Sequence, residues 1–193
     1  SYRKAFRWLT DRGVVEPAIQ PVPDPVAQRI PRAELVALLK TCTPVPACRD
    51  ADVLEHCRRK GIDPRRAPGG ILPRAGHPVY AHTREWWPSY RSTTWRIVLP
   101  MFDHRGALAG MHVRATDPAA TPKARWPIGV DCAGLFFANA EGRALLGGTC
   151  GESAPTEILI VEGFSDFFFA ASLAAPPGRA LLGIESGSAE RLR

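Results

Sequence analysis

Two carboxylates, Glu162 and Asp166, have the spacing in this sequence that best suits chemistry. They follow a short apolar run at 158–161, and Gly163 stands directly after the first of them. If a helix begins near Gly163, Asp166 lies in its first turn and can point to the same side as Glu162. Carboxylates so placed can share a hard cation such as Mg²⁺, which prefers oxygen ligands. A plainer alternative stays open, in which Asp166 stabilises the helix N-terminus and Glu162 is a surface acid at a strand end.

The residues around these carboxylates predict a βαβ unit. The run 158–161 is typical of a buried parallel strand, 164–174 of a helix, and 179–183 of a second strand. Glu162 is then expected at the carboxyl end of the first strand, where open α/β sheets bind their ligands. Gly183, Ser186 and Gly187 end or follow the second strand, and they fit either a phosphate-binding loop or simple Gly-Ser flexibility.

The whole chain predicts a mixed α/β (α+β) fold in three parts. We expect a helical and proline-rich linker region at 1–48, a basic subdomain at 49–150, and a partial βαβ domain at 151–193. Helices are expected at 1–12, 31–40 and 50–60. Apolar runs on both sides of 103–106 predict a β-hairpin, and 134–139 predicts a further strand.

Charge divides the chain in the same way. The net charge is +6, but residues 1–150 carry 22 basic and 13 acidic groups, whereas 151–193 carry three basic and six acidic groups. A basic body beside an acidic end suits a protein that holds a polyanion next to a metal ion. The excess of arginine over lysine, with abundant Ala, Gly and Pro, is equally typical of a GC-rich genome.

Aromatic residues lie among the arginines, and Trp86 and Trp87 are the candidates for stacking on unpaired bases. Packing in the core is the alternative for both side chains. Four histidines lack metal-ligand spacing and are expected in surface or turn positions: His77, His82, His104 and His112.

Five cysteines without a Cys-x-x-Cys pair argue against a disulfide scaffold and favour a reducing compartment. Their spacing predicts no zinc site. No apolar run is long enough for a membrane span, and the N-terminus does not resemble a secretory signal. We therefore expect a cytoplasmic protein without a membrane partner.

Two blocks of the sequence resemble a known family. The segment ILIVEGFSDFFFAASLA…ALLGIESGSA resembles the start of a Toprim domain, with its acidic EGxxD turn between strand and helix. The upstream block RIVLPMFDHRGALAGMHVRAT…TPKARWPIGVDCAGLFFAN resembles the basic subdomain that precedes Toprim in DnaG-type bacterial primases and in phage or plasmid primase-helicases. The matching positions are Pro100, Asp103, Gly106, Arg114, Pro122 and Lys123, and the resemblance covers about residues 50–193.

The resemblance implies a role for each matched residue. Glu162 would be the general base or metal-organising carboxylate near a primer 3′-hydroxyl, and Asp166 would help to hold Mg²⁺ or Mn²⁺. Arg114 and Lys123, with Arg96 as a further candidate, would contact template backbone or nucleotide phosphates. The complete enzyme would make short RNA primers on single-stranded DNA from NTPs, beside a fused or separate replicative helicase, in the bacterial cytoplasm or nucleoid. Its gene would belong to a phage, a plasmid or an integrated element.

Two departures from the family pattern keep other functions open. The family's Toprim domain continues to an Asp-x-Asp pair, which does not occur before Arg193, and the family's zinc module has no counterpart among the cysteines. We therefore expect residues 1–193 alone to be catalytically inactive. The alternatives are a Toprim nuclease or topoisomerase, and a non-catalytic module for single-strand binding or assembly.

Overall fold

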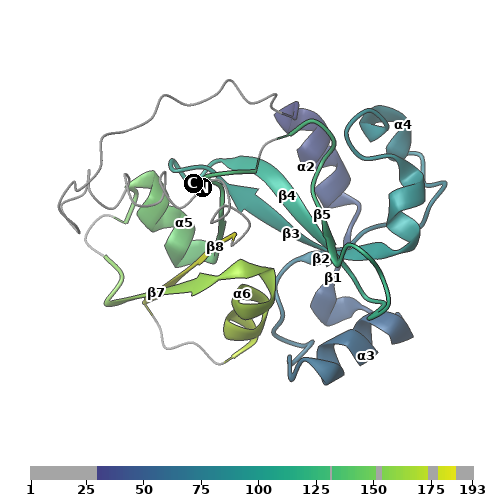
Figure 1. Ribbon diagram of the computed structural model, residues 1–193. Coiled ribbons are helices and arrows are strands. Elements are labelled where there is room, and N and C mark those ends of the chain that lie inside the picture. The colour runs from purple at the N-terminus through teal and green to yellow at the C-terminus, as the bar shows by residue number, and fades with distance from the viewer. Residues whose placement is uncertain (1–29, 131, 151–153, 174–177, 186–193) are drawn as a thin grey trace, which may run out of the picture.

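The computed structural model describes residues 30–130, 132–150, 154–173 and 178–185. Its centre is one mixed sheet with the strand order β1-β2-β3-β6-β8-β7, to which β4 and then β5 add beside β3 (Figure 1). The strands are β1 (Thr43–Pro44), β2 (Gly70–Ile71), β3 (Trp95–Phe102), β4 (Leu108–Ala115), β5 (Ala124–Arg125), β6 (Phe136–Ala138), β7 (Glu157–Glu162) and β8 (Arg179–Ile184). The helices are α2 (Arg32–Lys40), α3 (Ala51–Arg59), α4 (Tyr80–Thr83), α5 (Ala140–Gly147) and α6 (Gly163–Ser172). The predicted mixed α/β class is confirmed.

The hairpin of β3 and β4 organises the basic part of the chain. Asp103 accepts hydrogen bonds from the backbone N–H groups of Arg105 and Ala107 at 2.9 and 3.0 Å, and Gly106 has a φ of +70°. A carboxylate that satisfies two turn amides, followed by glycine in the left-handed region, fixes a tight reversal. The turn predicted at 103–106 is therefore confirmed.

Strand alternation gives the sheet two apolar faces. Leu99 lies opposite His112 on one face, and Val98 lies opposite Val113 on the other. Successive side chains of a strand point to opposite faces, so each face buries its own cluster. Helices α3 and α6 cover the first face, and α2 and α4 cover the second (Figure 1).

The predicted helices at 31–40 and 50–60 are confirmed as α2 and α3. The carboxylate of Asp50 caps α3 by accepting the N–H of Asp52 at 3.2 Å, and Gly61 follows the helix with a φ of +66°. A side-chain acceptor at the start and a left-handed glycine at the end are the usual boundaries of a short helix. The helix expected at 1–12 lies outside the described residues.

Helix α5 was not predicted, although its ends carry clear signals. The side chain of Asn139 accepts the N–H of Gly142 at 2.7 Å, and Gly148 closes the helix in the left-handed conformation. The helix has only eight residues and includes two glycines, which lower helix propensity. Its first turn and last turn are instead fixed by the two caps.

The predicted βαβ unit is confirmed as β7, α6 and β8. The prediction that its first strand is buried is wrong, because β7 is the last strand in the order of the described sheet and Ile158 and Ile160 are 43% and 42% exposed. The two strands are parallel, with Glu162 in register with Ile184, and α6 connects them. Strand β8 also pairs antiparallel with β6, so the unit extends the sheet of the basic part. The expected domain boundary after residue 150 falls between two segments that share this one sheet.

None of the five cysteines, all of which lie in described segments, forms a disulfide bond. Among the described residues, no helix is long and apolar enough to cross a membrane.

Candidate functional site

The turn between β7 and α6 carries the two candidate carboxylates. Glu162 is both the last residue of β7 and the N-cap of α6, and Gly163 has a φ of +78°. A residue with a Cβ is strained in that conformation, so glycine lets the chain pass at once from strand to helix. Asp166 lies in the first helical turn, and both carboxylates are exposed. This agrees with the placement expected from the EGxxD motif.

Within the described segments, these carboxylates have no ion-pair partner that would give them a structural role. Glu162 makes no side-chain capping hydrogen bond, and neither it nor Asp166 forms an ion pair with any residue in the described segments. Exposed, unpaired carboxylate oxygens suit Mg²⁺, which keeps several water ligands and takes few from the protein. The described residues contain no group of three or more His, Cys, Asp or Glu side chains placed to hold a metal ion. The turn therefore offers two candidate ligands and no complete cage.

Gly183, expected in a phosphate loop, has a packing role in β8. A Cβ at this position would lie 2.9 Å from Phe137 and 3.0 Å from Phe167. Glycine thus allows α6 to approach the sheet closely. Ser186 and Gly187, the other members of the expected loop, lie outside the described residues.

The backbones of Arg114 and Lys123 lie near each other at one end of the β4–β5 pair, with Lys123 opposite Ala115, the residue after Arg114. Arg114 is in register with Ala124, and the N–H of Ala115 donates to the carbonyl of Lys123 at 2.9 Å. Arg114 is half-buried, and Lys123 is exposed with its ammonium donating to the carbonyl of Pro118. Neither cation forms an ion pair with a described carboxylate, so both keep charge for an anion.

The C-terminal end of α3 adds positive charge beside Arg114. Arg59 donates to the carbonyl of Thr116 at 2.7 Å, which ties the helix to the end of β4. The pKa of His56 is lowered by burial, opposed by a hydrogen bond with the backbone of Thr116, and lowered further by Arg59, Arg114 and Lys60. Three permanent cations therefore lie within electrostatic reach of one histidine.

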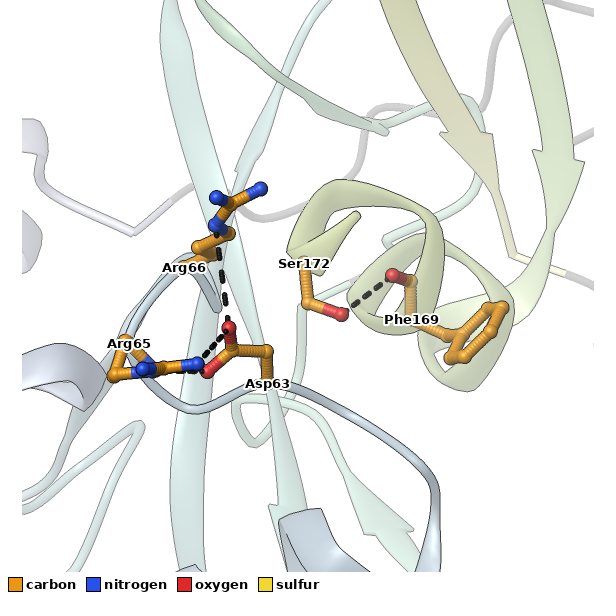
Figure 2. Close-up of polar contacts among 5 residues, drawn as sticks. All are labelled: Asp63, Arg65, Arg66, Phe169 and Ser172. Atoms are coloured by element: carbon orange, nitrogen blue, oxygen red, sulfur yellow. Dashed lines mark hydrogen bonds and ion pairs between the residues drawn. The ribbon is translucent and has the colours of Figure 1, made fainter. Parts of the chain in front are cut away.

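Neighbouring arginines are neutralised by acids, unlike Arg114. Figure 2 shows Asp63 between Arg65 and Arg66 in the loop after α3, with Nε–Oδ distances of 3.0 and 4.0 Å. The same view shows Phe169 and Ser172 of α6 near this loop, and Gly61 approaches the Phe169 ring. An arginine held by a neighbouring carboxylate has less net charge to offer a phosphate. The loop cations are thus weaker candidates.

Arg96 lies in an internal polar network. Its side chain is only 12% exposed, and its guanidinium lies 3.4 Å from Asp50 and donates to the carbonyl of Leu72 at 3.3 Å. These contacts join β3 to the N-cap of α3. They give Arg96 a structural partner, and its expected phosphate contact stays a prediction.

Trp86 and Trp87 are packed into the core, as the alternative interpretation allowed. They are 7% and 0% exposed, and their indole N–H groups donate to Glu34 at 2.8 Å and Ser92 at 3.0 Å. A ring without an exposed face cannot stack on a base, so this conformation contradicts the stacking role. Tyr90, which is 65% exposed, is the aromatic side chain of this region that faces solvent.

His112 and Glu185 are the polar pair that sequence reasoning missed. His112 was expected at the surface or in a turn, yet it is fully buried in β4, because Phe164 of α6 and Phe137 of β6 pack over its face of the sheet. Glu185 follows β8 directly. Alternation along 108–115 places His112 on the same face as Arg114 and opposite to Met111 and Val113, so it gave no signal for the burial of His112.

Comparisons with known proteins give limited similarity. No protein-family model matches the sequence, and no curated protein matches it. The solved structure of a DnaG primase catalytic domain bound to ssDNA superposes with a TM-score of 0.46 and 16% identity over 78% of this chain and 52% of that one. A structure of the DnaG catalytic core superposes with a TM-score of 0.46 and 16% identity over 78% of this chain and 53% of that one.

A third structure, the zinc-binding and RNA polymerase domains of the Aquifex aeolicus primase, gives a TM-score of 0.47 and 16% identity over 94% of this chain and 48% of that one. The chain therefore spans about half the length of the solved structures that it resembles. At such identity and superposition, the similarity says nothing about the activity of this chain.

Proposed function

We propose that this chain is the template-binding part and the first part of the Toprim domain of a DNA primase. The observation that carries the proposal is the turn from β7 to α6, where Glu162 is the N-cap, Gly163 has a positive φ and Asp166 lies in the first helical turn. The unneutralised pair Arg114 and Lys123, at matching positions of the upstream block, supports it.

The proposed chemistry is nucleotidyl transfer to a primer on single-stranded DNA. Glu162 would accept the proton of the primer 3′-hydroxyl or orient that group, and Asp166 would contribute a carboxylate oxygen to Mg²⁺ or Mn²⁺. The metal ion would neutralise developing charge on the phosphates. Arg114 and Lys123 would hold template or nucleotide phosphates in place, because phosphoryl transfer depends mainly on positioning and electrostatic stabilisation.

The partners and location belong to the same proposal. We propose NTPs and a single-stranded template as the bound molecules, a replicative helicase as a fused or separate partner, and the bacterial cytoplasm or nucleoid as the compartment.

Primer synthesis tests the proposal directly. In the resembling family an Asp-x-Asp pair completes the site, so the assay compares residues 1–193 with a longer version that contains such a pair. Labelled NTPs, a single-stranded template and Mg²⁺ should give oligonucleotides only with the longer version. Glu162→Gln should lower that synthesis by about a hundredfold or more.

Glu157→Gln is the matched control, because Glu157 begins the same strand and pairs with Arg179 at 2.7 Å, away from the turn. Equal loss in both variants would argue for a general effect on β7. Normal synthesis after Glu162→Gln would remove the assigned role.

A non-catalytic module for single-strand binding is the second candidate. It is favoured by Arg114 and Lys123, which form no ion pair with a described carboxylate and could bind phosphates without a metal ion. This function predicts single-strand binding that is unchanged by Glu162→Ala and no primer synthesis by either version. Nicking of plasmid DNA with metal ions but without NTPs would instead support a Toprim nuclease or topoisomerase.

A further inference from the structure

His112 connects three segments of the molecule from one buried position. Its imidazole lies 4.9 Å from the ring of Phe164 in α6, 5.1 Å from that of Trp126 and 5.6 Å from that of Phe137 in β6, measured between centroids. The residue is 0% exposed. Both ring nitrogens lack a hydrogen-bond partner among the described residues, which is costly for a buried polar group. The aromatic surroundings therefore do not explain why this position carries an imidazole.

The carboxylate of Glu185 is a polar neighbour that could explain the imidazole at this position. Its Oε2 atom lies 3.5 Å from Nε2 of His112, and this oxygen is itself buried without a hydrogen bond to any part of the chain that the structure describes. Two unpartnered polar atoms at that distance need only a small rotation to form a hydrogen bond. We treat His112 and Glu185 as one pair that joins β4 to the end of β8.

Arg114 is the alternative partner of this carboxylate. It lies two residues after His112 in β4, so both side chains point to the same face of the sheet. Arg114 and Glu185 act on each other electrostatically, but they form no ion pair within 4.0 Å. Burial raises the pKa of Glu185 to about 7, with Arg114 opposing the shift, so the carboxyl group is only partly stabilised by the cation. Glu185 therefore has a histidine 3.5 Å away and an arginine within electrostatic reach.

We propose that His112 is a positioning residue that holds Glu185 away from Arg114, so that the guanidinium stays free for a phosphate. Without the imidazole, the buried carboxylate would lose the polar neighbour that lies 3.5 Å away. An ion pair with Arg114 would then be its best compensation, because a buried charge needs a partner. That internal pair would compete with an external phosphate for the same cation. The consequence for nucleic acid rests on the proposed function, whereas the competition between His112 and Arg114 does not.

Binding of a fluorescent oligo-dT by variants with nearly equal side-chain volume tests the proposal. His112→Leu removes both polar nitrogens and should raise the Kd about tenfold, which is the effect of losing one charge-assisted contact. His112→Gln keeps an N–H donor and should stay within about twofold of the wild type. The double variant His112→Leu/Glu185→Gln removes the competing charge and should regain binding. Equal weakness of His112→Leu with and without Glu185→Gln would overturn the proposal.

A stability measurement decides the question without nucleic acid. Urea unfolding of Arg114→Ala, Glu185→Gln and their combination gives the coupling between these residues, once with His112 and once with His112→Leu. When His112 is present, the proposal predicts that the coupling between Arg114 and Glu185 changes the unfolding equilibrium constant by less than about twofold. In the His112→Leu background, it predicts a change of about fivefold. Equal coupling in both backgrounds would contradict it. If His112→Leu does not fold, His112→Phe takes its place, since an aromatic ring suits this aromatic site.

The two experiments separate the inference from the proposed function. Absence of oligo-dT binding by the wild type, with the coupling still dependent on His112, would remove the proposed function and keep the inference. Binding that depends on Arg114 but not on His112 would do the reverse.

Discussion

The rings of Phe164 and His112 lie 4.9 Å apart with their planes inclined by 32°. This contact attaches the first turn of α6, which carries Asp166, to the strand that carries Arg114. The proposed metal-binding carboxylates and the proposed phosphate-binding cation are thus connected through buried aromatic packing. Side chains in such a core have few alternative arrangements, so their spacing is held by the fold.

Salt dependence should identify the cations that bind phosphates. Each phosphate contact to single-stranded nucleic acid contributes about 0.7 to the slope of log K against log salt. Arg114→Ala and Lys123→Ala should each lower the slope by about that amount in oligo-dT titrations at several salt concentrations. Arg58→Ala is the control, because Arg58 is held by Glu55 at 2.7 Å. A larger effect of the control would place the binding surface on α3.

Substitutions of the buried Trp87 and the exposed Tyr90 should have opposite effects on stability and on oligo-dT affinity. Trp87→Phe loses the hydrogen bond to Ser92 and should lower the free energy of unfolding by about 1–2 kcal/mol without changing oligo-dT affinity. Tyr90→Ala should leave stability nearly unchanged and weaken affinity by about 1 kcal/mol if the ring stacks on a base. Urea unfolding and fluorescence anisotropy check the two quantities separately. Unchanged affinity in Tyr90→Ala would remove that residue from the binding surface.

Stability should depend on pH through Glu185. Burial raises its pKa from 4.5 to about 7, so the native state holds this proton more tightly than the unfolded chain does. The contribution of Glu185 to stability is therefore largest below pH 4.5 and is lost as the pH rises to 7. Glu185→Gln should be about 1–2 kcal/mol more stable than the wild type at pH 8, and nearly equal to it at pH 4. Parallel stability curves from urea unfolding would contradict this.

His112 should make stability depend on pH in the opposite direction. Burial, and secondarily Arg114, lowers its pKa from 6.5 to about 3, so the native state resists protonation. Stability from the neutral imidazole is present above pH 6.5 and is lost as the pH falls towards 3. His112→Gln should therefore lose less stability than the wild type between pH 6 and pH 4, by about 1–2 kcal/mol in urea titrations. Identical acid profiles would show that the imidazole does not titrate in this way.

Asn139 should be a sensitive position for stability. Its side-chain oxygen accepts the N–H groups of Gly142 and Leu181 at 2.7 and 2.9 Å, and its amide donates to the carbonyl of Arg179 at 2.9 Å. Asn139→Ala removes a helix cap and two contacts to β8, and it should cost about 2–3 kcal/mol in urea unfolding. Asn139→Asp keeps the acceptor and should cost about 1 kcal/mol. Equal losses in both variants would show that the acceptor contributes little.

Helices and strands whose apolar residues recur with a clear period could be predicted from the sequence. The hairpin around Asp103 and the βαβ unit were anticipated because apolar alternation and turn residues act locally. The burial of Trp87 and His112 was not, since only packing between distant segments determines which aromatic or polar side chain becomes enclosed. Arg96 and Asp50 likewise lie far apart in the sequence, and no local sequence pattern predicts their ion pair. The EGxxD turn was the exception at the site, because its glycine and acids are adjacent in the chain.

Strand β8 lies between β6 and β7, with antiparallel pairing on one side and parallel pairing on the other. The acidic βαβ segment therefore completes the sheet of the basic segment. A recombination event that exchanged only residues after 150 would have to supply a strand whose side chains fit both Phe137 and α6. A replacement strand with larger side chains at this position would overpack the core, which is destabilising. The two segments are therefore expected to be inherited together, as one unit of evolutionary change.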